Sequence, residues 1–285
     1  MPSLREIRHR LRAVGNIQQI TTAMEMVASA RLRKAQTKAE QARPYIRQIR
    51  QILEKVSSAT GNFSHPFFQH REVTKTAVVI VAGDRGLCGP YNSNVFNAAD
   101  RFLSPYTHDQ VELILIGQKA IDYYRLKKWP IGETIAHWGG KISFAEIKDF
   151  ASTLIHRFSI HELDEIWLVY TQFQNLLHRE VRVEKFLNIE RPKETNENTA
   201  YALDYIYDPN IEEIYAQILP RYCMAKMETV LDEAYASELA ARIFSMKAAS
   251  KNAEEMIEDL TLLHNKTRQA NITKEMLEIT SNLHT

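Results

Sequence analysis

The chain has little cysteine and, over its second half, no glycine. Two cysteines, Cys88 and Cys223, occur among 285 residues. They are far apart and form no CxxC pair, so we expect no disulfide framework and a reducing compartment. All nine glycines precede residue 141. The glycine-free remainder is rich in Ala, Glu, Lys and Leu toward its end, which predicts mostly helix.

Long apolar runs and familiar reactive motifs are also missing. There is no run of eighteen apolar residues and no apolar stretch at the N-terminus, so we expect neither a membrane-spanning helix nor a signal peptide. The ten histidines form no HExxH and no close cluster with Cys or Asp. No nucleophile elbow is present either. We therefore expect no metal, no cofactor and no catalytic residue.

The charge is uneven although the formal net charge is only +1. Residues 1–50 hold eleven Lys or Arg against three acids, a net of +8, and residues 221–285 hold eight against ten, a net of −2. The basic segment predicts an acidic or polar partner. Nucleic acid is an alternative partner, but no Phe, Trp or Tyr precedes Tyr45, which disfavours base stacking.

Three segments are expected, at 1–60, 70–207 and 208–285. The first contains a helix from about 3 to 57, with Ser3 and Glu6 as a capping box and Pro44 as a kink or stop. Its apolar residues follow one another by three and four, which places them on one stripe of the helix. They are Leu4, Ile7, Leu11, Val14, Ile17, Ile20, Met24 and Val27.

The middle segment alternates between strand and helix patterns. Apolar runs at 78–82, 111–117 and 166–170 predict buried parallel strands. Helices are expected between them, near 93–103, 118–127 and 143–160. This βαβ pattern predicts a small Rossmann-like sheet. Added strands, with antiparallel pairing as one option, are expected at 181–189 and 202–206, with a loop at 191–199.

The last segment predicts a long helix that starts after Asp208 and is kinked or restarted at Pro220. A heptad seam is expected at Met246, Ala249, Ala253, Met256, Leu260, Leu263, Thr267 and Ala270. Sixty helical residues span roughly 90 Å. The predicted fold is therefore α/β, a long antiparallel coiled coil of the N- and C-terminal helices with an inserted Rossmann-like α/β domain. The apolar C-terminal tip is expected to lie inside a partner.

The segment 83–92 follows a predicted strand and precedes a predicted helix. Its GxxGxxG spacing is a weak signal for a phosphate cradle, because the Gly-Lys-Ser/Thr of a P-loop is absent and Asp84 would repel phosphate unless it pairs with Arg85. A structural turn is favoured, in which Gly83, Gly86 and Gly89 serve positive φ angles.

Three separated groups of motifs resemble the ATP synthase gamma chain family over nearly the full length. They are IRHRL at 7–11 with NIQQITTAMEMVA at 16–28; DRGLCG at 84–89; and ASELAAR at 236–242 with MKAA at 246–249 and NKTRQANIT at 265–273. The chain departs from the family at Pro90 and Tyr91, where a glycine and a phenylalanine are usual.

The resemblance implies a central-stalk rotor (gamma) subunit that is not an enzyme itself. Such a subunit couples proton flow through the membrane sector to rotary ATP synthesis or hydrolysis in the alpha/beta hexamer. The implied partners are the alpha, beta, epsilon and delta subunits and the c-subunit ring, without nucleic acid. The implied location is peripheral, on the cytoplasmic side of the bacterial inner membrane.

The resemblance also implies partner contacts along the two terminal helices. It places Met24 against the beta subunits and Arg242 in a lower contact. The expected upper-contact residues are Arg268, Gln269 and Thr273, with Glu275 as a further contact residue. Two other functions stay open at this point. A nucleotide-binding Rossmann enzyme with helical arms predicts nucleotide binding by the chain itself, and a basic coiled coil predicts salt-sensitive binding to nucleic acid.

Overall fold

The computed structural model describes residues 3–59, 67, 72–139, 142–189 and 211–282. Two long helices, α1 (Leu4–Ala59) and α5 (Ile211–Asn282), flank the α/β elements in sequence. The chain forms two compact units, an α/β unit of residues 31–241 and a helix-pair unit of residues 1–30 with 242–285. The expected strand at 202–206, the loop at 191–199 and the helix start at Asp208 lie outside the described residues.

The α/β unit contains a five-stranded sheet in the order β3-β2-β1-β4-β5. Its strands are β1 (Thr76–Val81), β2 (Val111–Ile116), β3 (Ile131–Ile135), β4 (Glu165–Phe173) and β5 (Arg179–Leu187). The first four are parallel, and β5 pairs antiparallel with β4. The Rossmann-like expectation is thus confirmed, including the antiparallel strand near 181–189. The edge strand β3 was not predicted.

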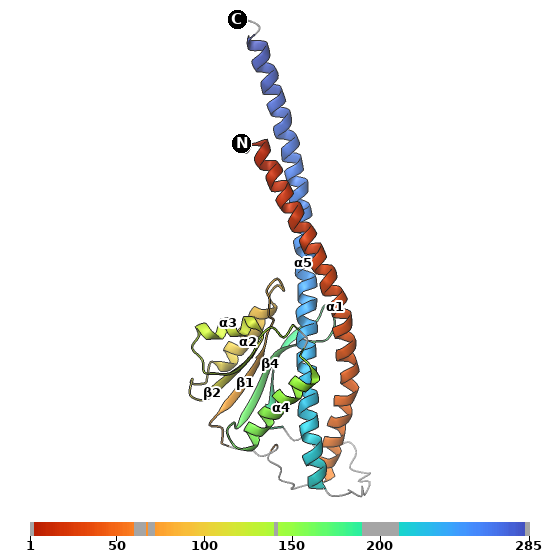
Figure 1. Ribbon diagram of the computed structural model, residues 1–285, viewed down its shortest axis with the longest axis vertical. Coiled ribbons are helices and arrows are strands. Elements are labelled where there is room, and N and C mark those ends of the chain that lie inside the picture. The colour runs from red at the N-terminus through yellow and green to blue at the C-terminus, as the bar shows by residue number, and fades with distance from the viewer. Residues whose placement is uncertain (1–2, 60–66, 68–71, 140–141, 190–210, 283–285) are drawn as a thin grey trace. The chain divides into compact units, whose positions relative to one another are not determined.

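Helices cover both faces of this sheet (Figure 1). α2 (Tyr91–Leu103) and α3 (Gln118–Leu126) lie on one face, and α4 (Phe144–Ser159) and α5 lie on the other. Side chains alternate along β1, so Val79 and Val81 join the α4/α5 core whereas Val78 and Ile80 join the α2/α3 core. All four are fully buried, which explains why this strand reads as a continuous apolar run.

α5 supplies a large part of the α4/α5 core. Its buried members are Tyr215, Leu219, Cys223, Met227, Val230, Leu231 and Ala234, and Ile49 and Leu53 join them from α1. Burial raises the pKa of the Cys223 thiol, so this cysteine is an inert core residue. Neither Pro44 nor Pro220 ends its helix. Around Pro220, the fully buried Leu219 and Cys223 anchor the helix on both sides of the lost hydrogen bond.

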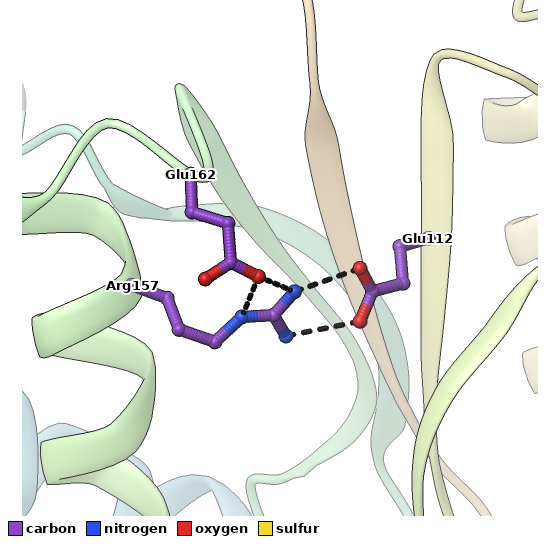
Figure 2. A network of polar contacts seen from close by, with 3 residues as sticks. All are labelled: Glu112, Arg157 and Glu162. Carbon is purple, nitrogen blue, oxygen red and sulfur yellow. Dashed lines mark hydrogen bonds and ion pairs between the residues drawn. The ribbon is translucent and has the colours of Figure 1, made fainter.

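An arginine between two carboxylates ties α4 to the sheet (Figure 2). The Arg157 guanidinium donates to both carboxylate oxygens of Glu112 on β2, at 2.9 and 2.8 Å. Its Nε donates to Glu162 at 2.7 Å. The hydrogen bonds to Glu112, followed by those to Glu162, raise the pKa of Arg157. Gly132 on β3 leaves the space that the Glu112 carboxylate occupies, because a Cβ there would lie 1.6 Å from Glu112 Oε1.

Within the α/β unit, α1 and α5 are also joined by charge. The Lys38 ammonium of α1 lies 3.0 Å from Asp232 and 3.2 Å from Glu228, one turn apart on α5. Burial and the neighbouring Glu228 raise the pKa of Asp232 more than Lys38 lowers it. One lysine therefore pairs with two acids, and its attraction does not offset the burial of Asp232.

In the helix-pair unit, two polar contacts fix the direction of the pairing. Arg8 Nε donates to His264 Nε2 at 3.3 Å, and the hydroxyls of Thr21 and Ser250 lie 2.6 Å apart. Positions rise along α1 as they fall along α5, so the helices run antiparallel, as predicted.

The heptad period of α5 is confirmed, but half of the predicted seam was wrong by one residue. One heptad position is buried as expected, at Met246, Ala253 and Thr267. At the other, Met256 and Leu263 are 53% and 39% exposed. Ser250 and His264 contact α1 instead, and the half-buried Ile257 lies between them in the heptad. Their hydrogen bonds to α1 make these polar residues compatible with the seam.

Candidate functional site

The loop after β1 contains an acidic residue that is fully engaged by the backbone. Asp84 Oδ1 accepts from the amides of Gln118 and His137 at 3.1 and 2.9 Å, and Oδ2 accepts from the amide of Gly139 at 2.7 Å. The carboxylate thereby occupies the N-terminus of α3, a position where a helix would otherwise attract an anion. Asp84 is therefore a structural residue of this loop.

The three glycines of the same loop have three different roles. Gly89 has φ +56°, as predicted, but Gly83 and Gly86 do not have positive φ, so that part of the prediction was wrong. Gly83 is needed for a close approach, since a Cβ there would lie 2.9 Å from Glu238 Cδ. Nothing lies within 4 Å of a Cβ at Gly86, whereas the non-glycine Leu87 takes φ +61°.

Pro90 fits the backbone at which the chain departs from the family. It is the N-cap of α2, with φ −82°, a value that the proline ring allows. Its carbonyl accepts from the amide of Asn94 at 2.8 Å and from the Ser93 hydroxyl at 3.1 Å. The loop therefore leads into α2 without needing an amide at position 90.

The crevice at the carboxyl ends of β1 and β4 is filled by the chain's own helix. In doubly wound sheets, ligands bind where the strand order reverses, which here is between β1 and β4. The Ser237 hydroxyl of α5 donates to the Thr171 carbonyl of β4 at 3.0 Å. The next residue, Glu238, is buried with its carboxylate against Gly83. A carboxylate at this place repels a phosphate group, which disfavours a nucleotide site.

The outer surface of the helix-pair unit carries an apolar stripe. Ile7 and Val14 are buried as predicted, but beyond them the predicted stripe leaves the seam, and Thr21 is buried instead. Ile17 and Ile20 are 52% and 59% exposed. Val27 and Met26 are exposed as well. The apolar pattern therefore continues along a face that the described residues leave exposed.

Met24 lies at the edge of this stripe. It is half-buried, between the seam and the exposed residues Ile20 and Val27. This placement is compatible with a partner contact and equally with a seam residue, so the role of Met24 stays a proposal.

The expected upper-contact residues share one end of α5. Arg268, Gln269, Thr273 and Glu275 are all exposed. The Thr273 hydroxyl donates to the Gln269 carbonyl at 3.0 Å, so these two lie on one helix face. The pairing of Arg8 with His264 places Leu4 level with residue 268. Beyond that level α5 continues past the start of α1 (Figure 1), with Ile272, Met276 and Leu277 exposed.

The proposed contact residues do not form one cluster. In the same pairing Met24 is level with residue 248, about 30 Å along the helix from Arg268. Arg242 is half-buried at the start of the α5 segment of the helix-pair unit. The sequence pattern missed the contact of Glu238 with Gly83, because a helical glutamate looks solvent-exposed until the fold is known.

No group of three or more His, Cys, Asp or Glu residues suited to a metal occurs among the residues that the structure describes. Over the same residues, no helix is both long and apolar enough to cross a bilayer.

Comparisons with known proteins agree over the whole chain. The family model described as ATP synthase matches residues 3–284. The ATP synthase gamma chain of Protochlamydia amoebophila is 54% identical, over 99% of this chain and 98% of its own length. The gamma chain of Desulfitobacterium hafniense is 41% identical, over 98% and 97%.

Solved structures agree on the fold. A chain from the central stalk and c-ring of the Tetrahymena thermophila mitochondrial ATP synthase has a TM-score of 0.63 at 20% identity, covering 81% of this chain and 99% of that one. A chain from the Euglena gracilis mitochondrial ATP synthase rotor has a TM-score of 0.62 at 17% identity, covering 94% and 98%. Together with the level of identity to the curated relatives and the full-length family match, this confirms the resemblance seen in the motifs: the chain belongs to the ATP synthase gamma chain family.

Proposed function

We propose that this chain is the rotating central shaft of a bacterial F-type ATP synthase and does no chemistry itself. Proton flow through the membrane sector turns the chain, and its asymmetric surface then favours a different conformation of each catalytic subunit in turn. In physical terms the shaft is a ligand with different contact energies for different conformations of the same site. The catalytic residues and the nucleotide belong to the partner subunits.

The uncovered apolar stripe of the helix-pair unit is the observation that carries this proposal. Exposed apolar residues that are contiguous on a surface mark a contact with a partner, and here they include Ile17, Ile20 and Val27. We assign the stripe and the exposed end of α5 to contacts within the alpha/beta hexamer. We assign the α/β unit to contacts with the epsilon subunit and the c-subunit ring. The delta subunit is the remaining proposed partner. We propose that the complex is attached to the cytoplasmic side of the inner membrane.

The filled crevice disfavours the nucleotide-binding enzyme, and this gives the first test. The purified chain is expected neither to bind nor to hydrolyse ATP, because Glu238 occupies the usual ligand position. A complex isolated through this chain from detergent-solubilised membranes is expected to contain the alpha, beta, delta, epsilon and c subunits and to hydrolyse ATP. Calorimetric titration with Mg-ATP and mass spectrometry of the complex make the two measurements. Saturable ATP binding by the chain alone, or a complex without those subunits, would refute the proposal.

Replacing Met24 by lysine is expected to impair coupling more than assembly. A methionine slides past its neighbours because it is flexible and uncharged, whereas a lysine adds an attraction to the acidic lobe that we propose for the beta subunits. A partly desolvated ion pair is worth about one to a few kcal/mol, against roughly 0–1 kcal/mol for an exposed pair. This attraction must be broken in every turn. The measurement is proton pumping per ATP hydrolysed in inverted membrane vesicles.

The control for this experiment is Met24→Leu, which keeps the apolar side chain and is expected to pump normally. Loss of the whole complex from membranes in Met24→Lys would mean that Met24 is a seam residue. Unchanged pumping would show that the side chain makes no rotating contact.

A further inference from the structure

We propose that residues 234–241 of α5 form a rotational lock, that is, a set of contacts that prevents α5 from turning about its own axis on the α/β unit. In this lock the Glu238 carboxylate packs against Gly83 and holds the helix in one rotational position. The inference rests on the proposed function, because the lock would be the place at which torque passes between the α/β unit and α5. The residues concerned are positioning residues and touch no substrate.

A lock is needed because the larger contact between α5 and the sheet is apolar. The buried residues from Tyr215 to Ala234 attach α5 firmly, but apolar contact is non-directional. Such a surface resists separation better than it resists turning of the helix about its own axis. Directional contacts therefore oppose this turning. One is the ion pair of Lys226 on α5 with Glu184 on β5 at 2.7 Å, and further ones lie at residues 234–241.

Two hydrogen bonds hold α5 to two different elements of the α/β unit, α2 and β4. The Tyr91 hydroxyl in the first turn of α2 donates to the Ala234 carbonyl at 3.1 Å. The Ser237 hydroxyl donates to the Thr171 carbonyl of β4 at 3.0 Å. Both bonds are buried. Because both partners belong to packed elements of the α/β unit, turning α5 about its axis moves Ala234 and Ser237 away from them and stretches these bonds.

Glu238, the residue after Ser237, adds a steric stop beside these bonds. Its carboxylate lies so close to Gly83 that a Cβ there would be 2.9 Å from Glu238 Cδ and 3.1 Å from Oε1. The Gly83 amide donates to Asn92 Oδ1 at 2.9 Å, and the adjacent Asp84 accepts three backbone hydrogen bonds. Gly83 is thus part of a loop that is fixed by hydrogen bonds at both Gly83 and Asp84.

Helix geometry shows how far α5 can rotate before these hydrogen bonds break. Side-chain atoms lie up to about 6 Å from a helix axis, so a rotation of 20° displaces them by about 2 Å. That displacement exceeds the range over which a hydrogen bond persists. The residues 234, 237, 238 and 241 share one face of α5 by their spacing, and Ala241 extends the contact to Cys88 and Tyr91. The lock therefore covers two turns of the helix.

The test uses the intact ATP synthase complex in inverted membrane vesicles. In Glu238→Ala we expect ATP hydrolysis to stay near the wild-type rate, while protons pumped per ATP fall about fivefold, the effect of losing a buried polar contact. Glu255→Ala is the matched control, because Glu255 is an exposed glutamate of the same helix, and it is expected to pump normally. Wild-type pumping in Glu238→Ala would overturn the lock. A wild-type complex that hydrolyses ATP without pumping would instead overturn the proposed function.

A disulfide provides a second test that does not depend on the stability of Glu238→Ala. Cys88 and Ala241 belong to the same buried cluster, so Ala241→Cys places a second thiol beside the native one. Oxidation is expected to link them and to leave pumping unchanged, because a locked joint does not move. In the double variant Glu238→Ala/Ala241→Cys, oxidation is expected to restore pumping, and reduction is expected to lower it about fivefold again. Failure to form the disulfide, or inhibition of the single variant on oxidation, would overturn the lock.

Discussion

Replacing Gly117 by alanine is expected to leave little folded protein. Gly117 joins β2 to α3 with φ +98°, and a Cβ there would lie 2.1 Å from the Ala82 carbonyl oxygen and 3.0 Å from that of Gly83. These are backbone atoms, and they cannot move freely. The Ala82 amide donates to β2, and the Gly117 amide donates to the Ile135 carbonyl at 2.8 Å.

Both the left-handed backbone and the collision therefore oppose the alanine side chain. Strain at such a position costs about 1–3 kcal/mol, and the collision adds to it. We expect a total loss above about 4 kcal/mol, which is exceptional for a single substitution and close to the whole stability of many domains. Soluble yield and thermal unfolding followed by circular dichroism measure the effect.

Gly86→Ala is the matched control for this prediction. No atom lies within 4 Å of a Cβ at Gly86, and its φ is not positive. The change removes freedom from the unfolded chain only, so stability is expected to stay the same or rise by up to about 1 kcal/mol. If Gly117→Ala unfolds at nearly the same temperature as Gly86→Ala, the argument about the Ala82 carbonyl is wrong.

The second large effect is expected at Gly132, because its missing side chain makes room for an ion pair. An alanine Cβ would lie 1.6 Å from Glu112 Oε1. The glutamate is flexible and can move, but only by leaving the two hydrogen bonds from Arg157. Loss of one partner of a buried pair costs about 3–5 kcal/mol. Because Arg157 keeps Glu162 and the site is partly exposed, we expect about 2–3 kcal/mol.

A double-mutant cycle separates this effect from simple crowding. Arg157→Met removes the guanidinium, so Glu112 is free to move away when Gly132→Ala is added. The cost of Gly132→Ala is then expected to shrink by more than the 0.5 kcal/mol at which neighbouring sites count as coupled. Urea unfolding of the four proteins gives the cycle. Additive costs would show that the alanine collides with something other than the paired carboxylate.

The sequence predicted those strands that are buried on both faces. β1, β2 after Glu112 and the middle of β4 read as apolar runs because helices cover both sides of the sheet there. The edge strand β3 is short, contains Gly132 and has no fully buried residue, so neither composition nor alternation marks it. Its existence depends on pairing with β2, a long-range contact that no local pattern contains.

The helix pair shows a different limit of sequence patterns. Steps of three and four fit two neighbouring stripes on a helix, one facing the partner helix and one beside it. Choosing the more apolar stripe selected Met256 and Leu263, whereas Ser250 and His264 contact α1. A shaft that meets other proteins carries apolar residues outside as well, so hydrophobicity alone does not identify its seam.

The candidate site likewise contains some features that the sequence predicts and others that it does not. The positions of Arg268, Gln269 and Thr273 on an exposed helix end follow from the motifs and the helical period. The role of Gly83 does not, because it depends on Glu238, a residue 155 positions away. A glycine in a turn suggests backbone freedom, and only the folded chain shows that the space beside it is used.

The part that α5 takes in the sheet core has a consequence for synthesis on the ribosome. Chains grow from the N-terminus and domains generally fold as units, yet the core on the α4 side of the sheet includes residues from Tyr215 to Ala234. A nascent chain that has emerged only to residue 189 already contains all five strands, but it leaves that apolar face open. The α/β unit thus reaches its final structure only after most of the chain has been made, and until then part of its core is exposed apolar surface of the kind that promotes aggregation.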